Sequence, residues 1–248
     1  MAFYDFLLGG RRQLQANIKR LIDRNAQAED REGSARWLAD NGSEEALYGM
    51  FGRFDLQVEH SLKDRKEKEL VFELLLEKGQ SILPIARRFA TASPNFQYAV
   101  RIVERLSSTE EAVALLLELL SKESIENEFK TEKKRTLLIA LAERKDPRIC
   151  PAAAPFLDDH DEGVRAAAVE AIGAQSEEAP QTLLLKALSN KREESTRIRG
   201  RLGEIFAERK WPLPDDPWLL NHLPQGFRLE AGILMAAPKK EGIRLMLG

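Results

Sequence analysis

Two runs of basic side chains carry the clearest chemical signal in this chain of 248 residues. The first run consists of Lys130, Lys133, Lys134 and Arg135. The second consists of Lys191, Arg192, Arg197, Arg199 and Arg201. Ammonium and guanidinium groups bind phosphates and carboxylates, so the two runs predict a positive stripe that would suit nucleic acid or an acidic protein. Neighbouring glutamates, however, favour a solvated, charge-balanced face over such a stripe.

Other residue types predict neither a metal site nor catalysis. His160 lies among carboxylates in the segment 158–162, but no second histidine follows at metal-ligand spacing, and His60 and His222 are isolated. The sequence has no glycine-rich phosphate loop and no Gly-x-Ser-x-Gly motif. We therefore predict no catalytic, cofactor-binding or metal-binding residue, and no enzyme.

Composition restricts the environment and the partners. The formal net charge is -2, which gives no general attraction to nucleic acid or to a membrane surface. The single cysteine, Cys150, excludes an intrachain disulfide and is expected to be a small buried hydrophobe. The sequence contains no hydrophobic run of transmembrane length, and its apolar amino terminus precedes its first arginines, the reverse of a secretory signal. We expect a cytoplasmic protein.

The elements that position these residues repeat along the chain. Ser43, Thr109 and Ser176 each precede two glutamates, and these serine and threonine positions lie 66 and then 67 residues apart. Hydroxyl residues cap helices, and carboxylates favour the first helical turn. Further helix-start signals at Ser81 and Asp146 divide these intervals, which gives a unit of roughly 33 residues, the period of a helical repeat array.

Each unit is expected to contain two antiparallel helices. Apolar residues at helical spacing follow the capped starts, as in Leu47, Met50, Phe51 and Phe54. The second helices of the pairs are predicted at 30–41, 64–78, 94–106, 131–145, 161–174 and 193–209, and an additional helix at about 11–25 completes the first pair.

The segment 151–173 resembles a HEAT repeat. It has a proline in its first helix, aspartates in the turn, Val164-Arg165 at the start of the second helix, and alanines that permit close helix packing. Residues 30–42 and 193–205 match this pattern in part. The resemblance implies an all-α fold, a right-handed α-solenoid of about five to six HEAT-like helical pairs over residues 11–210.

The two ends depart from the repeat pattern. Residues 1–10 are apolar and are expected to form an amino-terminal cap. Three prolines between Pro212 and Pro217 stop the array, so residues 211–248 are expected to form a proline-rich carboxyl-terminal cap. Weak alternation after Gly226 predicts a β-hairpin with its turn around 238–242, with a short helix over 229–237 as the alternative.

A solenoid of this kind predicts a non-catalytic scaffold or adaptor that binds another protein on its concave face. The candidate partner-binding residues are Lys133, Lys134, Arg135, Arg165, Arg197, Arg199 and Arg201. Two alternatives stay open. One is a nucleic-acid-binding protein similar to HEAT-like alkylpurine DNA glycosylases, although those are strongly basic and this chain has an isoelectric point of about 6.1. The other is a phycobilin lyase-like protein, because that family has similar repeats.

Overall fold

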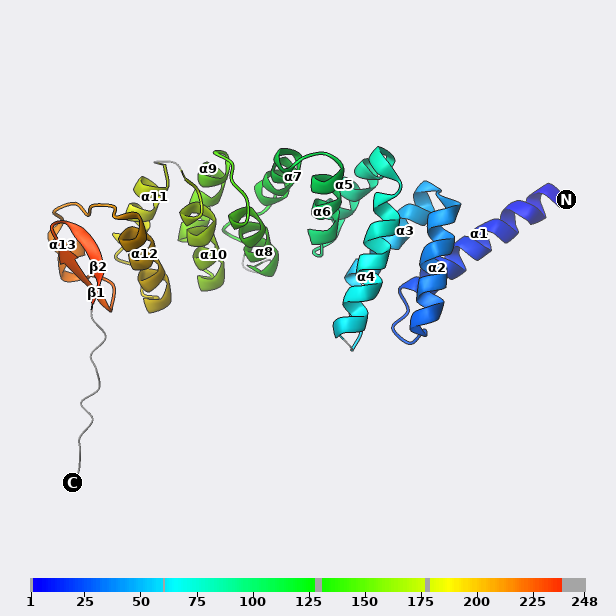
Figure 1. Ribbon diagram of the computed structural model, residues 1–248, viewed down its shortest axis with the longest axis horizontal. Coiled ribbons are helices and arrows are strands. Elements are labelled where there is room, and N and C mark those ends of the chain that lie inside the picture. Colours follow the sequence, from blue (N-terminus) through cyan, green and yellow to red (C-terminus); the bar gives the residue numbers. More distant parts are fainter. Residues whose placement is uncertain (1, 60, 128–130, 177–178, 238–248) are drawn as a thin grey trace, which may run out of the picture. The chain divides into compact units, whose positions relative to one another are not determined.

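The computed structural model describes residues 2–59, 61–127, 131–176 and 179–237, with the side chains described from residue 10 onward. The chain divides into two compact units, Met1–Leu119 and Leu120–Gly248. Helices dominate both units, as the repeat pattern predicts, and a small sheet lies near the carboxyl end of the second unit (Figure 1).

Helices alternate along the chain as first and second members of successive pairs. The first members are α1 (Ala2–Leu21), α3 (Glu44–Asp55), α5 (Leu83–Ala92), α7 (Thr109–Ser121), α9 (Ile149–Ala153) and α11 (Ala179–Leu188). The second members are α2 (Ala28–Asn41), α4 (Ser61–Leu76), α6 (Gln97–Leu106), α8 (Thr131–Ala142), α10 (Glu162–Gly173) and α12 (Thr196–Arg209). Among the residues that the structure describes, 3-10 turns extend two of these pairs: η1 (Gly79–Ile82) before α5 and η3 (Ala154–Asp158) after α9.

In the first unit the helices form two rows. Helices α1, α3 and α5 are in contact one after the other, as are α2, α4 and α6. The core between the rows includes Leu38, Met50, Phe51 and Leu75, which are fully buried. Each helix buries the stripe that its i, i+3 and i+4 apolar spacing creates, which is the packing expected of a repeat array.

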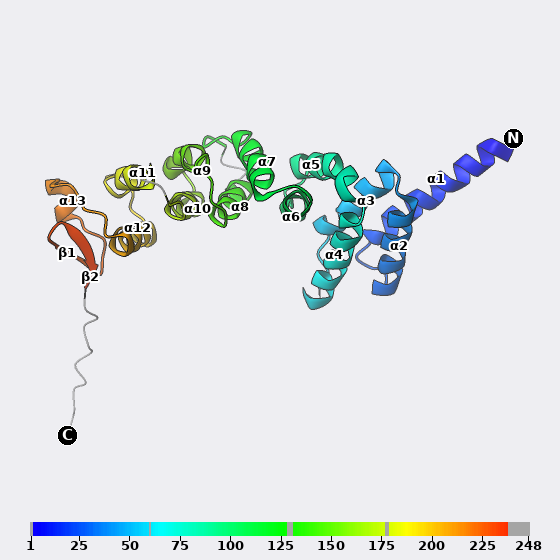
Figure 2. The same ribbon diagram turned by 45° about the horizontal axis from the view of Figure 1, so that its top comes forward.

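In the second unit α10 holds the neighbouring pairs together. It packs against α8 and α12 on its two sides and against α9, η3 and α11 in the other row (Figures 1 and 2). Its buried face includes Val164, Ala168 and Ile172. The alanines on α10 permit close approach of the adjacent helices, as the resemblance to a HEAT repeat implies.

Helix caps follow the predicted pattern in part. The signals at Ser81 and Asp146 precede α5 and α9 by two and three residues, and among the described residues no side chain caps either helix. The Ser43 hydroxyl accepts a hydrogen bond from the backbone N–H of Ala46, and Asp161 accepts one from that of Val164. At α7 the cap is Ser108 instead of Thr109, because the Ser108 hydroxyl accepts from the backbone N–H of Glu111 at 3.2 Å while Thr109 is the first helical residue. Both residues are good caps, so their order in the sequence does not distinguish them.

The first ten residues differ from the expected cap. Helix α1 begins at Ala2, so residues 2–10 continue the helix that was predicted to start at residue 11. No break or turn separates them from it, because Gly9 and Gly10 are both helical. A separate segment folded over the first helix pair is therefore not formed by these residues.

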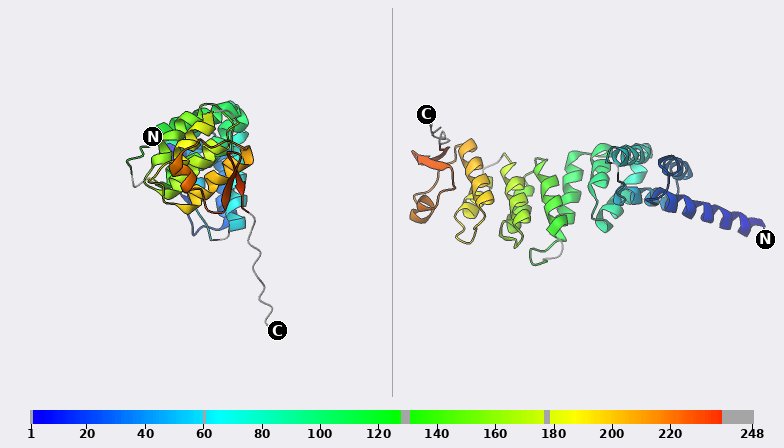
Figure 3. Two further views of the ribbon diagram at one scale, coloured as in Figure 1. Left: turned by 90° about the vertical axis from the view of Figure 1, so that its left-hand side faces the viewer. Right: turned by 90° about the horizontal axis from the view of Figure 1, so that it is seen from below.

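The carboxyl-terminal hairpin is confirmed, but with an earlier turn. Strand β1 (Phe227–Glu230) pairs antiparallel with β2 (Ile233–Ala236), and β2 packs on α12 (Figure 3). Ala231 and Gly232 form the turn with positive φ angles of 49° and 81°, as a two-residue hairpin of the right twist requires. Because alanine rarely adopts a positive φ, the sequence signal for a turn at Ala231 is weaker than the signal from the proline and glycine at 238–242. Residues 238–248 lie outside the described residues.

The proline-rich connection ends the helical array as predicted. Leu213 donates its backbone N–H to the Gly232 carbonyl at 2.8 Å, which joins the connection to the hairpin turn. A single helical turn, α13 (Pro217–Asn221), follows, and the Asp216 carboxylate caps it. Pro217 is tolerated there because the first position of a helix needs no N–H donor.

Candidate functional site

A groove with a volume of about 630 Å³ lies over α8, α10 and α12 in the second unit. Its lining includes the apolar side chain of Ile139, which is 47% exposed, and the small residues Gly163, Ala166 and Gly200. Charged side chains complete the lining: Arg135, Arg197, Arg201, Glu170 and Glu204. The groove therefore combines exposed apolar surface with charged groups.

Helical spacing explains why these residues share one face. On α8 the lining residues are four apart, and on α12 Arg197, Arg201 and Glu204 follow the same i, i+4 and i, i+3 pattern. Glycines and alanines at the intervening positions keep side chains from filling the space. Gly200 in particular has no atom within 4 Å of the position that a Cβ would occupy.

Three of the seven predicted binding residues line this groove, and each already has a carboxylate partner. Arg135 pairs with Glu132 at 2.7 Å, and Arg197, 64% exposed, pairs with Glu162 at 3.2 Å. Arg201 binds Glu170 through two nitrogens and also contacts Glu204. The hydrogen bonds that Arg201 donates to the Glu170 carboxylate are the largest influence on the pKa of Arg201 and raise it above its ordinary value. Positive charge in the groove is thus balanced by glutamates.

Lys134 lies outside the groove and is not a surface residue. Its side chain is fully buried, and its ammonium group contacts the buried Asp159 carboxylate at 2.5 Å. Lys134 therefore holds α8 to the turn before α10, and it is unavailable to a partner. Lys133 next to it pairs with Glu123 at 2.9 Å. Lys130 lies outside the described residues.

Arg165 also lies outside the groove and has a bridging role. It donates two hydrogen bonds to Glu193, at 2.7 and 3.2 Å, and one each to the carbonyls of Asp159 and His160. The hydrogen bonds with Glu193 raise the pKa of Arg165. These contacts join the start of α10 to the loop before α12.

Arg199 points away from the groove, toward the carboxyl-terminal cap. It donates to the carbonyls of Leu188 and His222 and lies 5.5 Å from the centre of the Trp218 ring. Burial lowers the pKa of its guanidinium group. Because Arg197 and Arg201 flank it on the other side of α12, the second basic run divides between two faces of one helix.

The sequence did not single out Ile139, Gly163, Ala166 or Gly200 as site residues. Ile139 follows a helical apolar pattern in which most members are buried, so only the contacts of α8 distinguish it from Leu137 and Leu138, which are fully buried. The sequence predicts a packing role for the alanines of residues 151–173, Ala166 among them, and gives no signal at Gly200.

Within the described ranges, no group of three or more histidine, cysteine or carboxylate residues is arranged to hold a metal ion. His160 instead lies 3.2 Å from the Asp159 carboxylate. Cys150 is buried. Among the helices that the structure describes, none is both long enough and apolar enough to cross a membrane.

Successive antiparallel helix pairs, stacked on one another within each unit, define a helical repeat protein. Within it, residues 123–201 match the family model for HEAT repeats. This match contains every groove residue named above except Glu204. No curated protein and no solved structure matches the chain.

Proposed function

We propose that this chain is a non-catalytic scaffold or adaptor that binds a protein through the groove on α8, α10 and α12. HEAT repeats present extended surfaces that commonly serve protein binding, and the matched repeats contain this groove. The observation that carries the proposal is the exposed Ile139 beside small residues, with paired charges around them.

The chemistry of the groove favours a protein segment over a nucleic acid. An apolar side chain of a partner would bury surface against Ile139 and Ala166, and its polar groups would meet the arginine–glutamate pairs at the edge. A phosphate chain would instead have to approach Glu132, Glu162 and Glu170, which already hold the arginines. Like-charge repulsion makes that approach unfavourable.

The experiment is site-specific photo-crosslinking of the full chain in its native cells. A photoreactive amino acid replaces Ile139 in one variant and the exposed Glu143, which does not line the groove, in a matched control. We expect one protein to crosslink from position 139, not from position 143, with or without nuclease. The crosslinked partner, once identified and purified, should then bind the Ile139→Asp variant at least about 10-fold more weakly than the wild-type chain. Such a loss is expected for a residue at the centre of an interface.

Two results would contradict the proposal. Crosslinks that disappear after nuclease treatment would indicate nucleic acid as the ligand. Equal crosslinking from positions 139 and 143, or unchanged affinity of the Ile139→Asp variant, would remove the groove as the binding site.

A further inference from the structure

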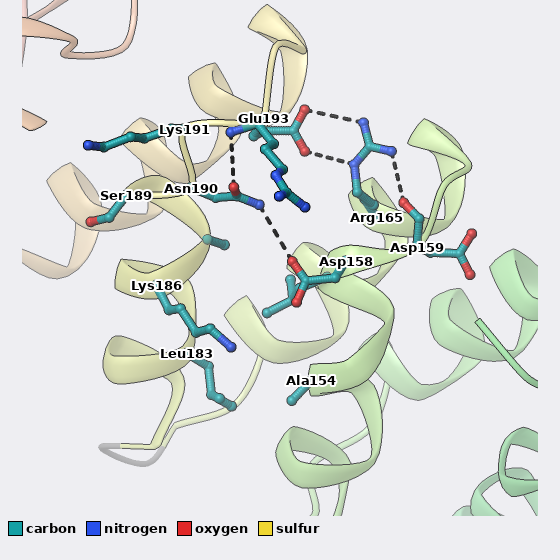
Figure 4. Close-up of a pocket in the computed structure, with 13 residues that line it drawn as sticks. Ala154, Asp158, Asp159, Arg165, Leu183, Lys186, Ser189, Asn190, Lys191 and Glu193 are labelled. Atoms are coloured by element: carbon teal, nitrogen blue, oxygen red, sulfur yellow. Dashed lines mark hydrogen bonds and ion pairs between the residues drawn. The ribbon is translucent and has the colours of Figure 1, made fainter. Parts of the chain in front are cut away.

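A second pocket, with a volume of about 810 Å³, lies between η3 and α11 (Figure 4). It is formed mainly by η3, α11 and residues 189–193, with Arg165 of α10 at its edge, whereas the groove lies on the second helices. None of the groove-lining residues contributes to it. The pocket therefore offers a second surface with its own chemistry.

One end of the pocket is apolar and the middle is charged. Figure 4 shows Ala154 and Leu183 at one end, while Lys186 from α11 and Asp158 from the end of η3 point into the space between the two elements. At the other end Arg165 and Glu193 form the ion pair described above. A ligand along the pocket would thus meet apolar surface first and charged groups next.

The charges in this pocket are not balanced. Asp159 and Glu193 are held by Lys134 and Arg165, which leaves Asp158 as the one carboxylate of the lining outside an ion pair. Three cationic residues of the lining remain, Lys186, Lys191 and Arg192, and in the part of the chain that the structure describes no carboxylate pairs with any of them. Lys191 instead lies 5.8 Å from the centre of the Trp218 ring.

We propose that this pocket binds a short segment of a protein partner in which an acidic residue stands next to an apolar one. The acidic side chain pairs with Lys186 and Arg192, and the apolar side chain packs against Ala154, Leu157 and Leu183. Asp158 accepts a hydrogen bond from a backbone N–H of the segment. From the residues that the structure describes, its carboxylate accepts one long hydrogen bond, from the Asn190 amide at 3.5 Å, and so has acceptor capacity left.

Asp158 also favours a carboxylate ligand over a phosphate group. A phosphate carries about twice the charge of a carboxylate at neutral pH, so its repulsion by Asp158 is correspondingly larger. A carboxylate flanked by backbone N–H groups satisfies both the cations and Asp158. The proposal does not depend on the function assigned to the groove, because a different surface and different residues carry it.

The experiment is selection of a random dodecapeptide library displayed on phage against the immobilised full chain. We expect the wild type to enrich aspartate or glutamate within two positions of a large apolar residue. The Lys186→Glu/Arg192→Glu variant should lose this enrichment and select lysine or arginine there, because both side chains are exposed and their replacement leaves the fold intact. Ile139→Asp serves as the control and should select the same acidic peptides as the wild type, which separates this site from the groove.

An individual selected peptide then tests the ligand class by fluorescence anisotropy. We expect the double variant to bind it at least about 10-fold more weakly, and inorganic phosphate to compete less well than acetate, which presents the single carboxylate of an aspartate side chain. The proposal is overturned by an absence of acidic enrichment, by enrichment that survives the charge reversal, or by phosphate competing better than acetate. The last outcome would assign a phosphate site.

Discussion

Several basic side chains in this protein serve as internal connectors. Arg53 is completely buried and donates hydrogen bonds to Asp64, to Glu67 and to the Leu56 carbonyl. Arg31 binds the same Glu67 from the neighbouring second helix. In the second unit Lys134 and Arg165 have comparable roles. Arg53 joins the two helices of one pair, whereas Arg31, Lys134 and Arg165 each join neighbouring pairs. These charged residues therefore stabilise the stacking of the array.

The pair of Lys134 and Asp159 gives a prediction on stability. Lys134→Met should lower the free energy of unfolding by about 3–5 kcal/mol, because removing one partner leaves a buried carboxylate uncompensated. Urea denaturation followed by circular dichroism measures the change. Lys186→Met, at an exposed position, should change it by no more than about 0.5 kcal/mol.

A double-mutant cycle with Asp159→Asn tests the cause. The asparagine side chain would keep an acceptor for the backbone N–H of Asp161, which Asp159 provides at 3.0 Å, but it would carry no charge. The two substitutions together should therefore cost less than the sum of their separate effects. Additive losses would mean that Lys134 acts through packing alone.

The first unit should lose stability in acid because of Asp64 and Glu67. Burial alone would raise the pKa of each carboxyl, but hydrogen bonds from Lys68 and Arg53 to Asp64, and from Arg31 to Glu67, lower the pKa below its ordinary value. The folded state then binds fewer protons than the unfolded state, so this stabilisation is complete at neutral pH and is lost below about pH 5. Urea denaturation between pH 7 and pH 3 should show the loss.

Neutral substitutions provide the control for this pH dependence. Asp64→Asn/Glu67→Gln should be less stable at pH 7, and its free energy of unfolding should change less between pH 7 and pH 3. Glu143→Gln, at an exposed residue, should keep the wild-type slope. An unchanged slope in the double variant would show that other carboxyls cause the acid sensitivity.

At the scale of elements, the sequence predicts those features that depend on residues close together in the chain, such as the position of a helix and its cap. Helical apolar spacing and the Ser43 and Asp161 caps located the pairs, because both signals lie within a few residues of one another. The burial of Lys134 depends on Asp159, 25 residues later, and no local pattern marks it. The groove likewise arises only when α8, α10 and α12 are brought side by side, so Arg135 and Arg201 were recognisable as candidates while Ile139 was not.

Two glycines on α12 give a matched test of element packing. A Cβ on Gly203 would lie 2.9 Å from the Phe227 ring of β1 and 3.1 Å from Pro224, whereas one on Gly200 would meet nothing within 4 Å. Gly203→Ala should therefore displace the hairpin and destabilise the protein. Gly200→Ala should stabilise it by about 0.5–1 kcal/mol, because alanine loses less backbone entropy in a helix.

Thermal denaturation compares the two variants, and hydrogen exchange of residues 227–236 reports on the hairpin directly. Faster exchange there in Gly203→Ala, with wild-type exchange in Gly200→Ala, is the expected pattern. Equal stability of the two variants would show that Phe227 does not hold the hairpin against α12.

At the scale of the whole molecule, the repeat architecture predicts that each helix pair is stabilised mainly by the pairs next to it. Each helix pair in a unit contacts mainly the pairs next to it, so the free energy of folding approximates a sum of repeat and interface contributions. The chain also divides into two compact units, so the free energy of folding should divide between the units as well as between the repeats. A local defect should consequently loosen nearby helices before it affects remote ones.

Hydrogen exchange of the intact chain carrying Lys134→Met tests this distribution. We expect the largest loss of protection in α8, η3 and α10, which meet at the Lys134–Asp159 contact, a smaller loss in α12, and wild-type exchange in α2 and α4. The reciprocal variant, Arg53→Met, should loosen α3 and α4 and leave α10 unchanged, since the Arg53 contacts lie within the first unit. A uniform loss of protection from α1 to α12 in either variant would show that the chain unfolds as one cooperative body. Binding in the groove could then be lost through a defect anywhere in the array, whereas distributed stability would keep a first-unit defect from abolishing it.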